Sequence, residues 1–92
     1  MKPLSYNSGS FQIFPNPVAD NLTIHWASQF KRLAVVTITD MLGREVYESK
    51  FLMDADEGDR EFGLTGLPDG LHMVTIKTDY MSYTSKMVKM KR

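Results

Sequence analysis

The sequence predicts an all-β domain, specifically a seven-stranded antiparallel immunoglobulin-like β-sandwich. Several short segments alternate apolar and polar residues with a period of two, which is the pattern of half-buried strands. Turn residues separate these segments at intervals of roughly 8 to 12 residues, as in sandwiches of this kind. No segment shows the period of an amphipathic helix. The 92 residues suffice for one small domain with a single thin core, and are too few for a deep catalytic cavity.

The first expected strand is short and ends at a rigid corner. Phe11 and Ile13 can share one face of this strand, because alternate side chains of a strand point the same way. Pro15 and Pro17 fix two φ angles and remove two backbone donors, so the hydrogen-bond ladder cannot continue through them. Asn16 precedes a proline and is pushed toward extended geometry, and its side chain can bond the local backbone. The Pro-Asn-Pro segment therefore predicts a corner near the start of the β-domain.

Residues 1–10 are expected to be a flexible linker, and residues 11–92 the folded domain. The first ten residues are rich in Ser, Asn and Gly, which is typical of linkers. They contain Lys2 but no apolar segment, so they do not read as a signal peptide. A linker in this place suggests that another segment belongs upstream. No apolar run approaches the roughly 20 residues of a membrane-spanning helix, so no transmembrane segment is expected.

The middle of the sequence predicts one strand followed by a hairpin. Residues 21–26 alternate cleanly between apolar and polar side chains. Residues 33–39 are rich in β-branched side chains, and residues 43–52 return beside them as the second strand of a hairpin. The side chains expected to point into the core from these strands are Leu22, Ile24, Trp26, Val36 and Ile38.

Two tight turns are expected. Asp40, Gly43 and Arg44 would build the turn of the hairpin, where Asp40 can cap the turn through its carboxylate and Gly43 can supply a positive φ. Leu67 and Gly70 bound a Leu-Pro-Asp-Gly segment, with the proline and the Asp-Gly pair at the usual places of a tight turn.

The second half of the sequence predicts an acidic loop and three further strands. The loop spans residues 54–59, and the strands span residues 60–64, 71–78 and about 83–90. In the expected strand at residues 71–78, one face is formed by His72, Val74 and Ile76. In the last strand, the side chains expected to face the core are those of Val88 and Met90. Lys86 would lie at the edge of this core, with its aliphatic stem along apolar surface.

The composition excludes several classes of function. The 11 basic and 11 acidic residues cancel, which argues against nucleic acid or an anionic membrane surface as the main partner. The chain has no cysteine, so it has neither a disulfide nor a thiolate metal site. No nucleophile elbow, paired carboxylates or metal cluster stands at an interpretable spacing. We therefore expect no enzyme and no cofactor.

Six short motifs follow one another along the chain. They are Phe-Gln-Ile-Phe-Pro-Asn-Pro-Val at residues 11–18, Asp-Asn-Leu-Thr-Ile at 20–24, Val-Thr-Ile-Thr-Asp at 36–40, Gly-Arg-Glu-Val at 43–46, Leu-Thr-Gly-Leu-Pro-Asp-Gly at 64–70 and Lys-Met-Val-Lys at 86–89. In this order and spacing the chain resembles the type A C-terminal sorting domain of the type IX secretion system of Bacteroidetes. The resemblance covers about residues 10–92. Two positions depart from it, because His72 and Thr39 stand where the family often has an aromatic residue.

The resemblance implies a non-enzymatic domain at the C-terminus of an exported protein, with a passenger domain upstream. Such a protein crosses the inner membrane with a signal peptide and reaches the periplasm. The translocon of the outer membrane and its shuttle proteins then recognise the sorting domain. A sortase-like peptidase commonly removes the domain, and the cut would fall within residues 2–10. The passenger would be secreted or held at the cell surface.

The last strand is the expected recognition element. A partner could read its edge by strand addition, with alternate side chains giving specificity. Lys86, Val88 and Lys89 are the candidate contacts, and the lysines would form a basic stripe that guides encounter. A second interpretation is open at this point, in which these lysines only keep an edge strand soluble.

Some other residues suggest chemistry, but the structural interpretation is favoured for each. Asp54, Asp56 and Asp59 are weak candidates for binding calcium. Their spacing differs from that of the EF-hand calcium loop, and a solvated acidic loop accounts for these carboxylates without a metal ion. His25 is expected to be exposed. His72 is expected to fill a packing position with one ring nitrogen hydrogen-bonded.

Two alternative functions belong to other classes of module. Trp26, Tyr80 and Tyr83 could form a platform for a carbohydrate-binding module, but the inward position of Trp26 favours the core. The chain could also be an immunoglobulin-like accessory module of a surface protein.

Overall fold

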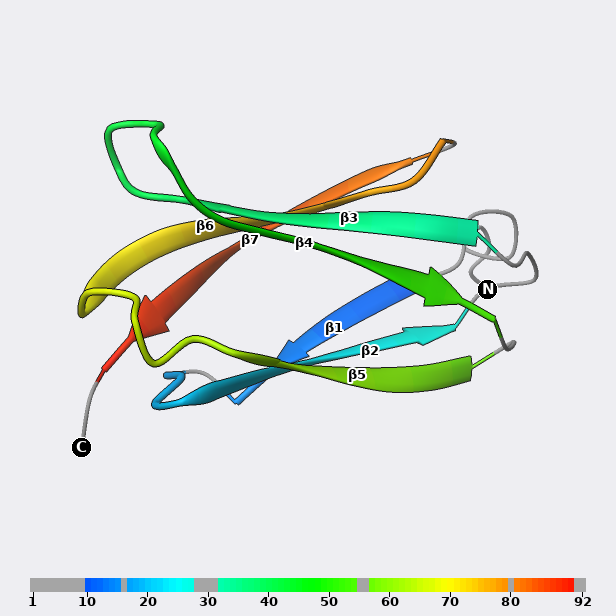
Figure 1. Cartoon of the computed structure of the whole chain (residues 1–92), viewed down its shortest axis with the longest axis horizontal. Coiled ribbons are helices and arrows are strands. Elements are labelled where there is room, and N and C mark those ends of the chain that lie inside the picture. Colours follow the sequence, from blue (N-terminus) through cyan, green and yellow to red (C-terminus); the bar gives the residue numbers. More distant parts are fainter. Residues whose placement is uncertain (1–9, 16, 28–31, 55–56, 80, 91–92) are drawn as a thin grey trace, which may run out of the picture.

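The computed structural model describes residues 10–15, 17–27, 32–54, 57–79 and 81–90 and shows a two-layered β-sandwich (Figure 1). The three-stranded sheet has the order β1-β2-β5, and the four-stranded sheet has the order β4-β3-β6-β7. The strands are β1 (Ser10–Phe14), β2 (Asn21–Ala27), β3 (Arg32–Thr39), β4 (Glu45–Met53), β5 (Glu57–Gly63), β6 (Gly70–Lys77) and β7 (Ser82–Lys89). Neighbouring strands in both sheets are antiparallel. The predicted fold class is confirmed.

The order of strands differs in one respect from a constant-type immunoglobulin domain. In that domain the fourth strand pairs with the fifth. Here β4 forms a hairpin with β3, and β5 pairs with β2 in the other sheet. The hairpin was expected from the sequence, and it is what assigns the fourth strand to the four-stranded sheet.

The core lies between the sheets and follows the alternation of the strands. Apolar side chains point inward at every second residue of β2, β3 and β6, as predicted. Among the aromatic residues, Trp26 and Phe51 have ring centroids 5.2 Å apart, and Phe62 lies 5.7 Å from Phe51. Five residues expected to point into the core from the first strands are buried, namely Leu22, Ile24, Trp26, Val36 and Ile38. The face expected to be shared by His72, Val74 and Ile76 is buried too. The Nδ1 atom of His72 lies 3.1 Å from the carbonyl oxygen of Gly70, as a hydrogen-bonded packing position requires.

The acidic segment is partly a strand, so the prediction of a loop over residues 54–59 was wrong. β5 begins at Glu57, and Gly58 pairs with Trp26 of β2. The indole lies directly over this glycine, because a Cβ atom at residue 58 would stand 2.6 Å from Cζ2 of Trp26. The absence of a side chain at Gly58 lets the large ring lie close to the partner strand. This fit extends β5 into a segment with low strand propensity.

The Pro-Asn-Pro corner moves the chain from one sheet to the other. β1 ends at Phe14 in the three-stranded sheet, and Val18 then forms a parallel bridge with Lys89 of β7 in the four-stranded sheet. Pro15 and Pro17 are exposed. Asn16 lies outside the described residues. The sequence predicts that a partner could read the edge of the last strand, and Val18 already occupies the end of that edge.

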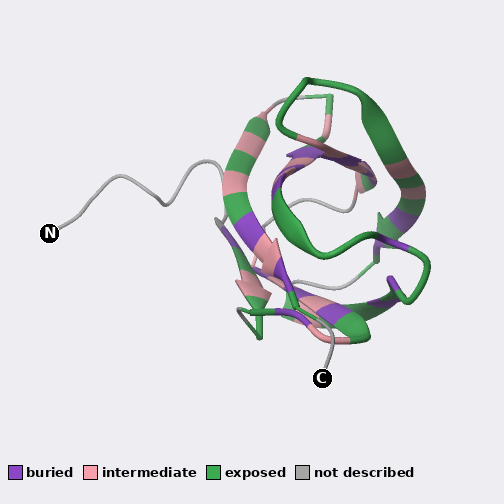
Figure 2. Ribbon diagram, turned by 90° about the vertical axis from the view of Figure 1, so that its left-hand side faces the viewer, coloured by how far each residue is buried: buried purple, intermediate pink, exposed green. Residues whose placement is uncertain are grey.

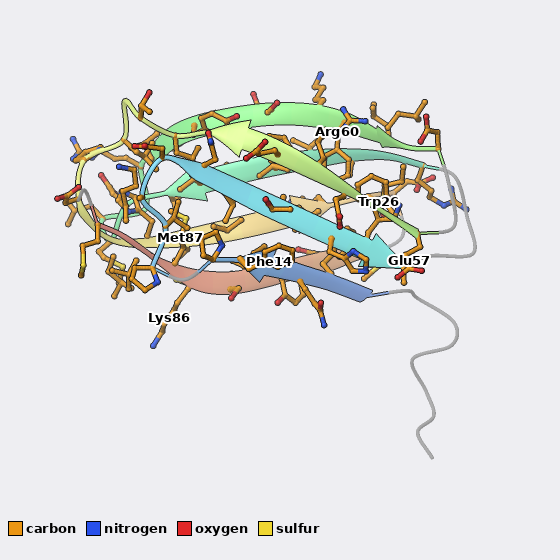
Figure 3. All side chains as sticks on the ribbon, turned by 90° about the horizontal axis from the view of Figure 1, so that it is seen from below. Phe14, Trp26, Glu57, Arg60, Lys86 and Met87 are labelled. Carbon is orange, nitrogen blue, oxygen red and sulfur yellow. The ribbon has the colours of Figure 1, made fainter. Side chains whose placement is uncertain are left out.

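The inward face of the last strand also differs from the prediction. Met87 and Lys89 are buried, Val88 is half-buried and Met90 is exposed. In Figure 3, Lys86 points away from the sandwich while Met87 lies between the sheets. The prediction of Val88 and Met90 as core residues was therefore wrong. Three apolar residues close together gave no clear alternation, and the apolar stem of a lysine can take a core position.

The hydrogen-bonded second turn lies three residues earlier than predicted. The N–H of Leu67 donates to the carbonyl of Leu64 at 3.0 Å, so the hydrogen-bonded turn spans residues 64–67. Leu67 is buried and joins the core. Gly70 has a φ of 130° and is the first residue of β6. The segment that leads into β6 thus begins at Leu67, which is fixed in the core, and ends at Gly70, which is the first residue of the strand.

Candidate recognition surface

The two ends of the sandwich carry different features. At one end, called here the linker end, β1 begins at Ser10 beside the last residue of β2, Ala27. At the other end, called here the turn end, β3 ends at Thr39, β6 begins at Gly70 and β7 ends at Lys89 (Figure 1). Any segment upstream of β1 joins the domain at the linker end.

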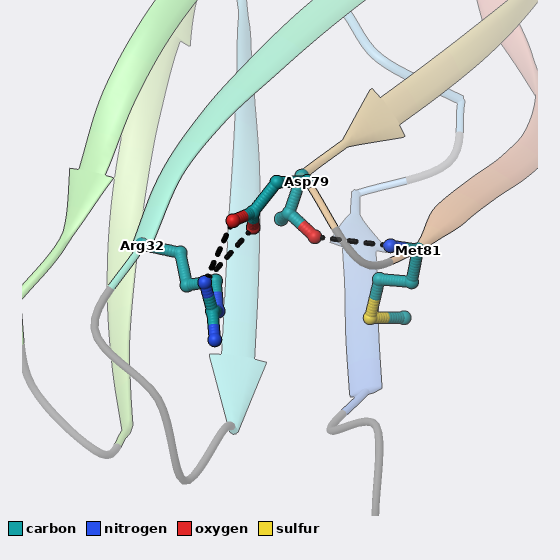
Figure 4. Close-up of polar contacts among 4 residues, drawn as sticks. Arg32, Asp79 and Met81 are labelled. Atoms are coloured by element: carbon teal, nitrogen blue, oxygen red, sulfur yellow. Dashed lines mark hydrogen bonds and ion pairs between the residues drawn. The ribbon is translucent and has the colours of Figure 1, made fainter.

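The linker end is held together by polar contacts between its loops. Nη1 of Arg32 donates to both carboxylate oxygens of Asp79, at 3.1 and 2.8 Å (Figure 4). The backbone N–H of Met81 donates to the hydroxyl of Thr78 at 3.2 Å (Figure 4). These contacts tie the start of β3 to the connection between β6 and β7.

The turn end contains a seam between the two ends of the domain sequence. The N–H of Val18 donates to the carbonyl of Val88, and the N–H of Met90 donates to the carbonyl of Val18, both at 2.8 Å. Val18 itself is fully buried. Lys89 is 2% exposed, and its Nζ lies 3.9 Å from Oδ1 of Asp69. The seam joins the first and last motifs of the sequence.

Lys86 and Lys89 do not form the basic stripe that the sequence suggested. They lie on opposite faces of β7, because odd-numbered residues of this strand face inward and even-numbered residues face outward. Lys86 is exposed and Val88 is half-buried on the outer face. Of the three candidate contacts, these two are open to a partner along that face.

The turn between β3 and β4 is tightly hydrogen-bonded. The carboxylate of Asp40 accepts the backbone N–H of Leu42 at 2.9 Å and that of Arg44 at 3.0 Å, and it also accepts Nε of Arg44 at 2.8 Å. The hydrogen bond from the Arg44 backbone is the main reason why the pKa of Asp40 is lowered, and the Leu42 backbone adds to it. The backbone N–H of Gly43 donates to the Asp40 carbonyl at 3.0 Å, with a φ of 87° at the glycine. The predicted roles of Asp40 and Gly43 are confirmed.

The predicted motif residues thus gather at one end of the molecule. Val18, Asp40, Gly70 and Lys89 come from distant parts of the sequence and all lie at the turn end. What the sequence did not reveal is the contact of Val18 with β7. Val18 is an isolated apolar residue after two prolines, and only its full burial distinguishes it.

A second polar cluster lies on the outer face of the three-stranded sheet, where the sequence predicted only an exposed histidine. Nδ1 of His25 contacts Oδ1 of Asp59 at 2.5 Å, and its Nε2 lies 3.1 Å from Oε2 of Glu57. The hydrogen bond with Asp59 is the largest cause of the raised pKa of His25, and the charges of both carboxylates add to it. Two acidic residues spaced by two positions were the available signal, since this spacing places them on one face of a strand.

The calcium candidates are not gathered into a site. Asp54 is exposed, Asp59 contacts His25, and Asp56 lies outside the described residues. Among the described residues, no three or more His, Cys, Asp or Glu side chains are grouped so that they could hold a metal ion. Nor does this part of the chain contain a helix long and apolar enough to cross a membrane.

Trp26 is not available for the carbohydrate-binding platform that was considered from the sequence. Trp26 is 2% exposed and packs against Phe51, so its face is not open to a sugar. Tyr83 is half-buried beside Phe11, with ring centroids 5.9 Å apart. Tyr80 lies outside the described residues. The prediction that Trp26 is a core residue is confirmed.

Comparison with known proteins agrees with the fold and the motifs. The family described as "Secretion system C-terminal sorting domain" matches residues 12–90. Among solved structures, the chain is similar to dimeric latent PorU from Porphyromonas gingivalis, with a TM-score of 0.64 and 19% sequence identity. The similarity covers 91% of this chain and 9% of that one, so the chain spans a small part of the length of PorU. No curated protein matches the chain. Because the family match extends over nearly all of its sequence, the chain belongs to the C-terminal sorting domains of the type IX secretion system.

Proposed function

We propose that this domain directs an upstream passenger through the type IX secretion system and across the outer membrane, to the cell surface or the medium. The observation that carries the proposal is the family match over residues 12–90. The sandwich fold, which is similar to a part of PorU, agrees with it. The domain acts in this proposal as a signal that is read by other proteins, and it performs no chemistry itself.

The turn end is the surface that we propose is read. An upstream passenger joins at the linker end, where β1 begins, so the turn end lies on the far side of the domain from it. A surface in that place can be presented in the same way by different passengers. Lys86 and Val88 are the proposed contacts on β7 because their side chains face outward. The side chain of Lys89 is buried in the seam beside Asp69, so in this proposal it holds the end of β7 in place and does not contact the partner.

We also propose strand addition along β7, limited to the part of its edge that Val18 leaves open. The carbonyl of Val88 accepts a hydrogen bond from Val18, so the backbone groups of Val88 face the outer edge of the sheet. In a strand, every second residue directs its backbone groups to the same edge. The other even-numbered residues of β7, which are Ser82, Thr84 and Lys86, therefore direct their backbone groups to the part of this edge that Val18 does not cover. A partner strand would therefore pair with the first part of β7 and stop where Val18 begins.

We further propose that a sortase-like peptidase removes the domain after export. The family resemblance supports a cut in the linker, at residues 2–10, of which only Ser10 belongs to β1. Cleavage there would separate the passenger from an intact sandwich. The peptidase, the translocon and its shuttle proteins are the proposed partners.

Export of a fusion protein tests this function. A signal peptide and a fluorescent passenger are placed before residues 1–92 and produced in a host that has the type IX system. We expect the passenger outside the cell or on its surface, and a shortened form if the linker is cut. The same fusion in a strain without the translocon serves as the control. Retention of the intact fusion in the periplasm of the competent host would contradict the proposal.

A further inference from the structure

The turn between β3 and β4 presents apolar side chains to solvent at its tip. Leu42 is 81% exposed and Met41 is 58% exposed, the two highest values among the large apolar side chains of the described residues. Figure 2 views the turn end, and this turn is exposed at the top of the picture. Tips of surface turns are usually built from Gly, Asn, Asp, Ser and Pro. Two neighbouring apolar side chains in this place need an explanation that the fold does not supply.

The turn holds these side chains in a fixed position. Asp40 and Arg44 are joined by a backbone hydrogen bond of 2.9 Å across the turn, besides the three hydrogen bonds accepted by the Asp40 carboxylate. One of those three comes from the N–H of Leu42 itself. A segment that is already ordered loses little conformational freedom when it binds. The turn is therefore suited to present Met41 and Leu42 to a partner.

Further exposed apolar side chains lie at the same end of the molecule. They belong to the start of β4, the start of β6 and the end of β7, and are those of Val46, Leu71 and Met90. Val46 and Leu71 face outward from the four-stranded sheet by the alternation of their strands, and Met90 directly follows β7. The turn thus projects from an end of the molecule that also carries other exposed apolar side chains.

We propose that Met41 and Leu42 form a projecting knob that inserts into a concave apolar pocket of a protein of the secretion machinery. The pocket is expected to carry a carboxylate at its rim, facing the guanidinium of Arg44, whose side chain is 74% exposed. This proposal rests on the proposed sorting function and names the form of the surface that is read.

The size and charge of the surface favour this partner over two others. A stable dimer buries about 800 Å² on each partner, contributed by roughly 20 to 30 residues, whereas transient contacts between proteins are smaller. The knob and the three other exposed apolar residues of this end suit a transient contact. A second copy of the chain is therefore not the expected occupant. An anionic membrane is disfavoured because the exposed carboxylate of Glu45 and that of Asp40 flank the knob. An apolar protein pocket can enclose the two side chains while Asp40 and Arg44 stay paired at its rim.

The test compares two pairs of substitutions in the passenger fusion. M41S with L42S removes the apolar knob and leaves Asp40, Gly43 and Arg44 in place. L33S with L52S is the matched control, since these leucines form a cross-strand pair at the linker end of the same hairpin and are 55% and 51% exposed. Burial of one such side chain corresponds to about tenfold or more in affinity. We expect the knob variant to lower the rate of export at least about tenfold, and the control to leave it within about twofold.

Several measurements decide between the outcomes. Equal melting temperatures of the purified chains are required for the comparison, and a fall in export of the same size in both variants would refute the knob. Export of the knob variant at the normal rate would refute it too, whereas failure of the unmodified fusion would refute the sorting function instead. Loss of a wild-type dimer in sedimentation, or of binding to phosphatidylglycerol vesicles, would assign the knob to a second copy or to a membrane and overturn the proposal.

The rim carboxylate has its own test. Arg44→Gln keeps the backbone hydrogen bonds to the Asp40 carboxylate and removes the cation together with its Nε hydrogen bond to Asp40. Its melting temperature is therefore compared with that of the wild type before export is measured. We expect it to lower export severalfold, while Arg60→Gln, on the other sheet, does not. Equal export of both variants would remove the carboxylate from the proposal.

Discussion

Substitution of Gly58 by alanine tests how the large core ring is accommodated. The added Cβ atom would stand 2.6 Å from Cζ2 of Trp26 and 3.0 Å from its Cη2, closer than folded proteins tolerate. The indole cannot retreat freely, because it is 2% exposed and its centroid lies 5.2 Å from that of Phe51. Overpacking of this kind costs about 1 to 3 kcal/mol. We expect Gly58→Ala to lower the free energy of unfolding by this amount.

Gly63 offers a matched control in the same strand. A Cβ atom there would have Oδ1 of Asn21 as its nearest neighbour, at 3.6 Å, which is an ordinary contact. Both glycines belong to β5, and neither has a positive φ. An alanine at a compatible position stabilises by about 0.4 to 1 kcal/mol, because the unfolded chain loses freedom. Gly63→Ala should therefore be neutral or stabilising.

Urea unfolding followed by tryptophan fluorescence and circular dichroism measures both variants. A double-mutant cycle with Trp26→Phe then isolates the contact, since a smaller ring makes room for the new methyl group. We expect a coupling energy of at least about 0.5 kcal/mol in favour of the double variant. Equal stability of the two alanine variants, or a coupling energy near zero, would refute the argument that the indole lies on Gly58.

Three further predictions concern the turn, the seam and the histidine. Asp40→Ala should lower the melting temperature, because the N–H groups of Leu42 and Arg44 lose their acceptor, whereas Asp40→Asn should lower it less; differential scanning fluorimetry measures both. Val18→Ala keeps the backbone bonds and removes two buried methyl groups, and should cost about 1 to 3 kcal/mol in urea unfolding. The raised pKa of His25 should make its ion pairs stabilising below pH 6.5, with this stabilisation lost as the pH rises through the folded-state pKa. The difference in urea midpoint between wild type and His25→Gln should accordingly shrink from pH 5.5 to 8.5, and a constant difference would contradict this.

Local patterns were sufficient to predict most of the sandwich. The alternation of Leu22, Ile24 and Trp26 identified β2 and its buried face, because one-sided burial fixes every second residue of a strand. Asp40 and Gly43 identified the hairpin turn, since the capping and the positive φ are properties of those residue types. Each of these features depends only on residues that are neighbours in the sequence, so the sequence alone was enough to predict it.

Features that depend on distant residues were not predictable in the same way. Glu57 and Gly58 read as a loop by propensity, and they form a strand because the indole of Trp26 covers the glycine. Met87, Val88 and Met90 allow either face to be buried, and the inward position of Lys89 follows from its pairing with Gly70 and Val18. In each case tertiary packing decided between two local patterns that the sequence permitted equally.

The seam changes how recognition by the last strand has to be tested. A truncation that removes residues 86–92 also removes the fully buried Met87 and the acceptor and donor that Val18 uses on β7. Such a chain loses part of its core and both seam hydrogen bonds, so failure of its export reports unfolding as much as a lost contact. Substitutions confined to the outer face, at Lys86 or at the knob, leave the seam in place. The first motif of the domain therefore takes part in holding the last strand, and only changes that spare this contact separate recognition from folding.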